Sequence, residues 1–288
     1  MSRLLSLLVL ISLVNYIVFK DVIYLSSLIF YVFPLPVILG VSFLNLMLNI
    51  KTKKKVFYAF ISILILVFWM YKSYIVNHIE DVNVESEVVY WNAAKKRSFI
   101  DAFAVSETIP DVLVLVEYDQ TDKQLLNKIK SKFAKYHFKV IHGKIGVFSK
   151  CRIRNIVPIK MGNNSFMVKF KTKIKNKEFS FYAIDITANI KFFRKHMLEE
   201  AFGYVITTKN TIIVGDFNTP YESLHFEMYR QRFKHAFTEK GNGFLETWMW
   251  NLPILSLDHV WVSKDLKLRM VNKINTWESD HAMLKIQL

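Results

Sequence analysis

The chain has 288 residues, of which 52% are hydrophobic, and a formal net charge of +15. Its only cysteine, Cys151, excludes an internal disulfide and a cysteine-based metal site, and we expect this side chain to pack. Seven of the 39 Lys and Arg residues and one of the 24 Asp and Glu residues precede residue 77, which leaves 32 against 23, or about +9, for the remainder.

The positive charge of residues 77–288 has two interpretations. A basic surface attracts polyanions such as nucleic acid or anionic lipid head groups. It also serves solubility alone, and no basic stripe rich in aromatic residues favours single-stranded nucleic acid. Composition therefore leaves the partner open, and the sequence identifies no protein partner.

Three apolar stretches predict a transmembrane region over residues 1–76. The spans are expected at about residues 4–20, 22–50 and 56–76. The second and third exceed the ~20 residues that cross a bilayer. A cleaved signal peptide is an alternative for the first stretch, but no small-residue cleavage site follows it.

Two prolines, Pro34 and Pro36, lie inside the second stretch and predict a kink there. A split into two helices is the alternative, although each half is then too short to cross a membrane. The basic loop Lys51–Lys55 should stay cytoplasmic, which places the residues after 76 outside the cytoplasm. Binding of anionic lipid heads by these lysines would place the loop at the same leaflet.

A polar, acidic linker is expected over residues 77–85, followed by a folded domain over residues 86–288. In this domain strand-like runs alternate with helical patterns, which predicts sheets with helices packed outside them. The helical patterns cover residues 95–108, 121–136, 190–206 and 223–233.

Polar side chains follow two of the apolar strand-like runs. Glu117 ends the run that starts at Asp111, and its carboxylate suits a hard cation. Asp216 and Asn218 follow the run 212–214, and they face one side because alternate residues of a strand point the same way. Such a pair can hold a water or a phosphate oxygen, although Asp and Asn after a strand often only form the turn.

Two further acidic positions lie near the C-terminus. Asp258 interrupts the strand-like run 257–262, and Ser279-Asp280-His281 precedes the final apolar run. An Asp beside a histidine can hold the imidazole in one tautomer and orientation. His259 follows Asp258 but should point to the opposite face of the strand, and we expect a structural role for Arg194.

With these motifs in this order, the chain resembles the endonuclease/exonuclease/phosphatase superfamily over about residues 86–288. Trp91-Asn92 is similar to the family's first-strand Asn, and Glu117 to its metal-binding Glu. Gly215-Asp216-Phe217-Asn218 matches the GDFN signature, Asp258 the penultimate motif and Ser279-Asp280-His281 the terminal SDH. The resemblance implies an α/β (α+β) four-layer sandwich of two packed sheets flanked by helices, here preceded by about three transmembrane helices.

The resemblance also implies a site chemistry. Glu117, with Asn92 and Asp280, is expected to bind Mg²⁺, with Mn²⁺ as a close substitute. Asp216 is expected to orient or deprotonate the attacking water, and Asn218 and Asn92 to bind the phosphate. Asp258 is expected to hold the His281 side chain in place. His281 is expected to act as a general acid, a general base or a charge stabiliser at the phosphate.

One position departs from the family pattern. Many members carry a His where the strand-like run 178–186 ends, whereas this chain has Asp185. A carboxylate donates a hydrogen bond to phosphate only when it is protonated, which leaves stabilisation of the leaving group open here. A substrate-binding role, a second metal contact and a solvated residue at a strand end are alternatives for Asp185.

The leading hypothesis is a membrane-anchored, metal-dependent hydrolase of phosphate esters, a phosphodiesterase or nuclease, in a bacterial inner membrane with its catalytic domain outside. A lipid head-group phosphatase or phosphodiesterase is the close alternative, because a tether raises the effective concentration of the site near the bilayer. A non-catalytic binding domain on the same fold is the third. The fold alone does not choose the substrate.

Overall fold

The computed structural model describes residues 2–49, 51–78, 86–118, 123–141 and 144–288. Most of the expected linker, residues 79–85, lies outside this part of the chain. Residues 77 and 78 are described, and the Asn77 side chain donates to the carbonyl oxygen of Gly241 at 2.8 Å. The strand before the linker, β1 (Tyr74–Ile75), pairs with β11 (Gly243–Phe244).

Within the described residues, the remaining strands form two six-stranded mixed sheets. The first runs in the order β13 (Met270–Ile274), β14 (Met283–Gln287), β2 (Glu87–Asn92), β3 (Val112–Val116), β5 (Ile145–Ser149) and β4 (His137–Ile141). The second runs in the order β10 (Phe233–His235), β12 (Asp258–Ser263), β9 (Thr211–Asp216), β8 (Lys177–Asp185), β7 (Phe166–Ile174) and β6 (Arg154–Lys160).

The central strands are apolar on both faces, as strands covered on both sides require. Every residue of β3 and of β9 is buried. One face of each sheet packs against the other sheet, and Val88, Val114, Val214 and Val260 meet in this shared core. The pairs β2–β3 and β8–β9 are parallel, so within each sheet the carboxyl ends of the two strands lie at the same edge.

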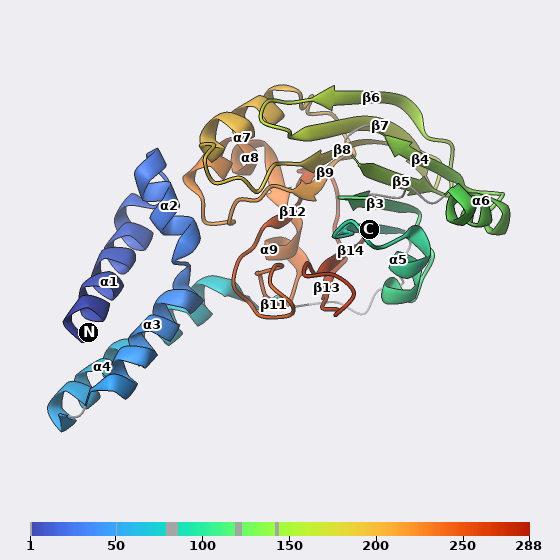
Figure 1. The fold of residues 1–288 in the computed structure, drawn as a ribbon. Helices are drawn as coiled ribbons and strands as arrows, with labels where there is room; N and C mark the ends of the chain where they lie inside the picture. The colour runs from blue at the N-terminus through green and yellow to red at the C-terminus, as the bar shows by residue number, and fades with distance from the viewer. Residues whose placement is uncertain (1, 50, 79–85, 119–122, 142–143) are drawn as a thin grey trace.

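Helices cover the outer faces of both sheets (Figure 1). The first sheet is covered by α5 (Phe99–Ser106) and α6 (Lys123–Lys132), and the second by α7 (Arg194–Gly203), η2 (Leu224–Phe226) and α8 (Glu227–Arg232). The short helix α9 (Ala236–Lys240) follows β10. The expected sandwich of two packed sheets flanked by helices is confirmed.

Local chemistry explains where the helices begin. Ser98 caps α5, because its hydroxyl accepts from the Asp101 amide and the Asp101 carboxylate accepts from the Ser98 amide. The helical pattern expected from residue 190 becomes a helix only at Arg194, and residues 190–192 stay exposed. The expectation that Cys151 packs is wrong, because this residue is exposed in the turn after β5.

Among the described residues before the sandwich, there are four helices and one π-helical turn: α1 (Ser2–Val14), η1 (Asn15–Phe19), α2 (Tyr24–Val32), α3 (Leu35–Leu48) and α4 (Thr52–Ser73). Residues 2–19 and 52–73 are long and apolar enough to cross a membrane. Hydrogen bonds join three of the helices, since the Ser6 hydroxyl pairs with Tyr58 at 2.6 Å and accepts from Asn45 at 3.0 Å. Small and polar residues of this kind are typical of contacts between transmembrane helices.

The stretch expected as a second span is not one kinked helix. It divides at Phe33 and Pro34 into α2 and α3, whose axes differ by 65°. Pro34 lacks an amide hydrogen and forces the residue before it out of the helical region, so the break falls at the first proline. Together α2 and α3 are one broken span or a re-entrant segment by length and composition.

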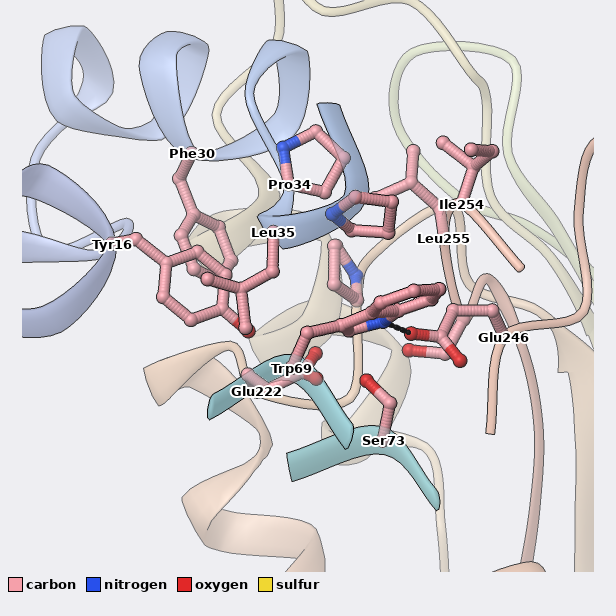
Figure 2. Close-up of a pocket in the computed structure, with 13 residues that line it drawn as sticks. Tyr16, Phe30, Pro34, Leu35, Trp69, Ser73, Glu222, Glu246, Ile254 and Leu255 are labelled. Atoms are coloured by element: carbon pink, nitrogen blue, oxygen red, sulfur yellow. Dashed lines mark hydrogen bonds between the residues drawn. The ribbon is translucent and has the colours of Figure 1, made fainter. Parts of the chain in front are cut away.

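The N-terminal helices pack directly on the sandwich (Figure 2). Tyr16 and Trp69 lie beside Glu222, Glu246 and Leu255 in a small pocket between the two parts. The Trp69 indole donates to the Glu246 carboxylate at 2.9 Å.

A second junction contact is more deeply buried. Asp21, which has no exposed surface, accepts from the Ser223 hydroxyl and from the Leu224 amide. The N-terminal segment is thus fixed on the two-sheet sandwich by specific polar contacts.

Glycine at position 215 is required by the approach of two strands. A Cβ at Gly215 would lie 2.1 Å from the carbonyl oxygen of Ile184 on β8. We expect Gly215→Ala to lower the free energy of unfolding by about 1–3 kcal/mol, because a backbone atom of Ile184 must move to make room for the Cβ. Thermal unfolding of the full-length protein in detergent measures this. Gly203→Ala is the control, since nothing lies within 4 Å there; equal unfolding temperatures for the two variants would contradict the packing.

The junction should weaken as the pH rises. Burial, together with the charge of Glu246, raises the pKa of Glu222 from 4.5 to about 7, against the opposing charges of Lys20 and Arg230. A raised carboxyl pKa favours the folded state most below pH 4.5, and this contribution is lost as the pH rises toward 7. We expect Glu222→Gln to reduce the fall in unfolding temperature between pH 5 and pH 8 by at least ~2 °C. Glu227→Gln, at an exposed position, should leave the fall unchanged.

Candidate active site

Side chains from both sheets meet at the rim where β2, β3 and β9 end. Because β12 is antiparallel to β9, Asp258 at its start pairs with Asp216 at the end of β9. Glu117 follows β3 and Asn218 follows β9, both in the left-handed backbone region, with φ of 50° and 46°. Such backbone angles are uncommon outside glycine and turn the chain sharply at the strand end. The strand ends therefore place their polar residues around one cleft.

Asp258 and His281 form a buried hydrogen-bonded pair. The imidazole Nδ1 of His281 donates to the Asp258 carboxylate at 2.8 Å. The same carboxylate accepts from the Tyr90 hydroxyl and from the Thr247 hydroxyl, each at 2.7 Å. These three donors fix the orientation of the Asp258 carboxylate. The carboxylate in turn holds the His281 imidazole, whose Nε2 points away from Asp258.

Asp216 lies on the Nε2 side of the imidazole. Its carboxylate is 4.0 Å from Nε2 of His281. The same carboxylate accepts hydrogen bonds from the side-chain amide of Asn92 at 3.0 Å and from the backbone amide of Asn218 at 2.8 Å. Asp216 and Asn92 come from different sheets, so this contact closes the rim. A water or a phosphate oxygen near Asp216 is also within reach of His281.

The other predicted ligands line the same cleft, which has a volume of about 400 Å³. Glu117, Asp216, Asn218, Asp280 and His281 all contribute to its lining. The structure therefore brings these predicted residues together. Asn92 lies behind Asp216 and is fully buried.

The charges of the site shift the titration of its members. Burial lowers the pKa of His281, but the charge and the hydrogen bond of Asp258 outweigh burial and raise it to about 10. Burial and the charge of Asp258 raise the pKa of Asp216. Burial, with the charges of Asp216 and Glu117, raises the pKa of Asp185 well above 3.8, which favours the neutral acid that can donate a hydrogen bond.

Two sets of side chains could hold a metal ion. Asp216, Asp258 and His281 offer atoms within 4.8 Å of one another. In this group Asp258 already accepts three hydrogen bonds, one of them from Nδ1 of His281, so hydrogen bonds account for its close approach. Glu117 and Asp280 instead line the cleft with carboxylates, a donor set that suits Mg²⁺ or Mn²⁺. The Lys95 side chain, which is 61% exposed, forms an ion pair with Glu117 at 3.4 Å.

Three residues considered in the sequence analysis have structural contacts near the site. The side-chain amide of Asn218 donates to the backbone carbonyl of Ile186 at 2.7 Å, which links the ends of β8 and β9. Arg194 is buried and donates to the Asn218 carbonyl at 2.9 Å, in agreement with its expected structural role. His259 points away from the cleft, as expected, and its Nε2 lies 2.8 Å from the Thr219 carbonyl.

Sequence reasoning missed three residues that orient the site. Tyr90 precedes Asn92 by two positions on β2, so the alternation of the strand could have identified it. Thr247 lies in a long loop where no local pattern marks it. Trp248, in the same loop, donates its indole hydrogen to Asp280 at 3.1 Å.

Comparison with known proteins agrees with this geometry. Residues 82–281 match the sequence model of the Endonuclease/Exonuclease/phosphatase family. The chain belongs to this family. Family members are hydrolases of phosphate esters, and the chain is assigned to that class. No curated protein matches the chain significantly.

Solved structures of the same fold come from distant organisms. The human Nocturnin catalytic domain is 16% identical, with a TM-score of 0.54, over 73% of this chain and 95% of that one. A mannosyl-6-phosphatase of Bacteroides thetaiotaomicron is 15% identical, with a TM-score of 0.52, over 70% and 98%. D. rerio TDP2 with a single-stranded DNA product is 10% identical, with a TM-score of 0.51, over 70% and 98%. At these identities the likeness shows the fold.

The hydrogen bond from Tyr90 should contribute measurably to stability. Removing one donor leaves the buried Asp258 carboxylate with a lone pair unsatisfied, which costs about 1–3 kcal/mol. We expect Tyr90→Phe to lower the free energy of unfolding by this amount, measured by chemical denaturation in detergent. Tyr204→Phe is the control because this side chain is exposed; a Tyr90→Phe protein as stable as the control would show that the hydrogen bond contributes nothing.

Proposed function

We propose that the protein is a membrane-anchored, divalent-metal-dependent phosphodiesterase. One observation carries this proposal: a buried Asp258–His281 pair faces Asp216 in a cleft that Glu117 and Asp280 also line. A phosphate in this cleft meets a cationic imidazole on one side and carboxylates suited to a cation on the other. Phosphoryl transfer needs this combination of positioning and charge stabilisation.

Each side chain has a role that follows from its contacts. Glu117 and Asp280, with help from Asn92, would hold Mg²⁺ or Mn²⁺, which neutralises charge on the phosphate oxygens. Asp216, oriented by Asn92 and the Asn218 amide, positions the attacking water in line with the leaving group. His281 carries a proton at neutral pH because Asp258 raises its pKa, so it stabilises the phosphate or protonates the leaving oxygen.

Substrate binding is shared by several polar residues. Asn218 lines the cleft, and we assign it to the phosphate as well as to the brace with Ile186. Asp185 replaces the histidine of the family pattern. Asp185 ends β8 opposite Asp216 of β9, and burial raises its pKa, which supports the neutral form. A neutral carboxyl could donate a hydrogen bond in place of the family's histidine.

Membrane anchoring is the second part of the proposal. The outer faces of the candidate spans expose large apolar side chains, including Leu10, Phe60 and Val67 at 58–59% exposure. Apolar surface of this extent marks contact with a membrane or a partner. With the lysines at 51–55 in the cytoplasm, the positive-inside rule places the catalytic domain outside, in a bacterium on the periplasmic side of the inner membrane.

Metal dependence tests the proposal directly. The purified full-length protein should hydrolyse bis-p-nitrophenyl phosphate in the presence of Mg²⁺ or Mn²⁺, lose the activity in EDTA, and regain it when the ion is restored. Hydrolysis that persists in EDTA would refute metal dependence. A well-folded protein without hydrolysis under any divalent ion would favour a binding domain.

His281 should be essential for turnover but not for folding. Removal of a general acid or charge stabiliser costs about 10²–10⁴ in rate. We expect this loss in kcat for His281→Ala with bis-p-nitrophenyl phosphate and Mg²⁺, while the unfolding temperature stays within a few degrees of the native protein. His196→Ala is the matched control, because this side chain is 76% exposed on α7. Equal rates for the two variants would exclude His281 from the reaction.

A further inference from the structure

One wall of the catalytic cleft comes from the N-terminal apolar segment. Tyr31 and Val32, the last two residues of α2, line the cleft together with Glu117, Asp280 and His281. The helix α2 has nine residues, too few to cross a bilayer by itself. It is the first of the two helices into which the second apolar stretch divides. The chain changes direction after Val32 and continues as α3 from Leu35. The apolar segment is therefore part of the site.

The position of this wall is fixed by buried contacts. The Asp21 carboxylate, just before α2, accepts from the Ser223 hydroxyl and from the Tyr31 hydroxyl, the latter at 3.1 Å. The backbone oxygen of Asp21 lies 2.7 Å from the imidazole of His225. At the other end of α2, Phe30 and Leu35 line the small pocket of Figure 2 together with Leu255 from the sandwich. A flexible tether would show none of these contacts.

The rest of this side of the cleft is also apolar. Ile190, from the exposed segment before α7, and Leu255 line the same cleft as Val32. Val32 and Ile190 are 51% and 49% exposed, so an apolar surface continues from the cleft to the outside. Next to the site residue Asp280, the exposed Trp250 donates its backbone amide to the Asp280 carbonyl at 3.2 Å. Exposed tryptophan of this kind is typical of the membrane interface.

Cationic side chains are scarce in the same cleft. Among the described residues that line it, Arg194 is the only lysine or arginine, and its guanidinium donates to the backbone carbonyls of Asn218 and Asn189. A groove for nucleic acid needs cations that follow successive phosphates, with aromatic platforms for the bases. The cleft offers one charged end and one hydrocarbon-like wall, which suits a single phosphate attached to an apolar group.

We infer that the substrate is an amphiphilic phosphate ester held in the bilayer. Its phosphate reaches Glu117, Asp280 and His281, while its hydrocarbon part passes along Val32 and Ile190 into the membrane. The inference rests on the proposed phosphodiesterase function and deepens it, because it assigns the substrate class and two residues that select it. The N-terminal helices would then hold the site at a fixed distance from the bilayer and supply part of the substrate-binding surface.

Two chromogenic diesters with the same reacting centre test the inference. Hexadecyl p-nitrophenyl phosphate, in phosphatidylcholine vesicles that contain the full-length protein, is compared with methyl p-nitrophenyl phosphate in the same vesicles. In both, water adds to phosphorus and p-nitrophenolate leaves. We expect kcat/KM to be at least ~10-fold higher for the hexadecyl ester, as burial of a few methylene groups allows.

Variants of the wall separate this surface from simple concentration of the lipid in the vesicle. Val32→Asp and, as a milder change, Ile190→Ser should reduce the ratio of the two rates to less than ~3 because a polar group then faces the chain. Val157→Asp and Ile206→Ser are matched controls, since these residues are 47% and 59% exposed outside the cleft. The controls should keep the full ratio, and unfolding temperatures should establish that all four variants are folded.

The outcomes distinguish the inference from the function on which it rests. If neither ester is hydrolysed, the phosphodiesterase proposal fails. If the methyl ester is hydrolysed as efficiently as the hexadecyl ester, or the wall variants keep the full ratio, the hydrolase stands and the amphiphilic substrate is refuted. Single-stranded DNA is the third arm, and faster cleavage of DNA than of the hexadecyl ester would replace the lipid-like substrate with nucleic acid.

Discussion

The site depends on hydrogen bonds that cross from one sheet to the other at a single rim. Tyr90 and Asn92 on β2 donate to Asp258 and Asp216 on the second sheet, and His281 returns from the first sheet to Asp258. Buried carboxylates are stable only when such donors satisfy them, so the two sheets must pack in one register for the fold to tolerate these charges. The same contacts that hold the sheets together orient the imidazole and the carboxylate that face the cleft.

The N-terminal helices add a second constraint, which is also polar and buried. Asp21 reaches Ser223 and Leu224, and Trp69 reaches Glu246, so the helices are bound to the sandwich at two separate points. Rigid attachment sets the direction in which the cleft opens relative to the helices. This arrangement allows the half-helix α2 to contribute a wall of the cleft, which a long flexible linker could not hold in place.

Local signals predicted much of the site. The GDFN run placed Asp216 at a strand end because strand alternation and the following proline are properties of neighbouring residues. Glu117 was identified as the acidic residue at the end of an apolar run and His281 by its place after Asp280, in agreement with the family motifs, and the structure places both in the cleft with Asp280. Thr247 could not be found in this way, since it reaches Asp258 from a loop whose shape depends on the packed strands around it.

The sequence by itself determined the strands, the helices and the identity of the polar groups at the strand ends, because these depend on periodicity and residue chemistry over short stretches. Pro34 likewise marked the position of the break between α2 and α3. Only the tertiary structure decided how far the chain turns there and what α2 contacts, because Asp21 and Ser223 are 202 residues apart. Contacts across such separations arise from the packing of complete elements, which no local pattern specifies.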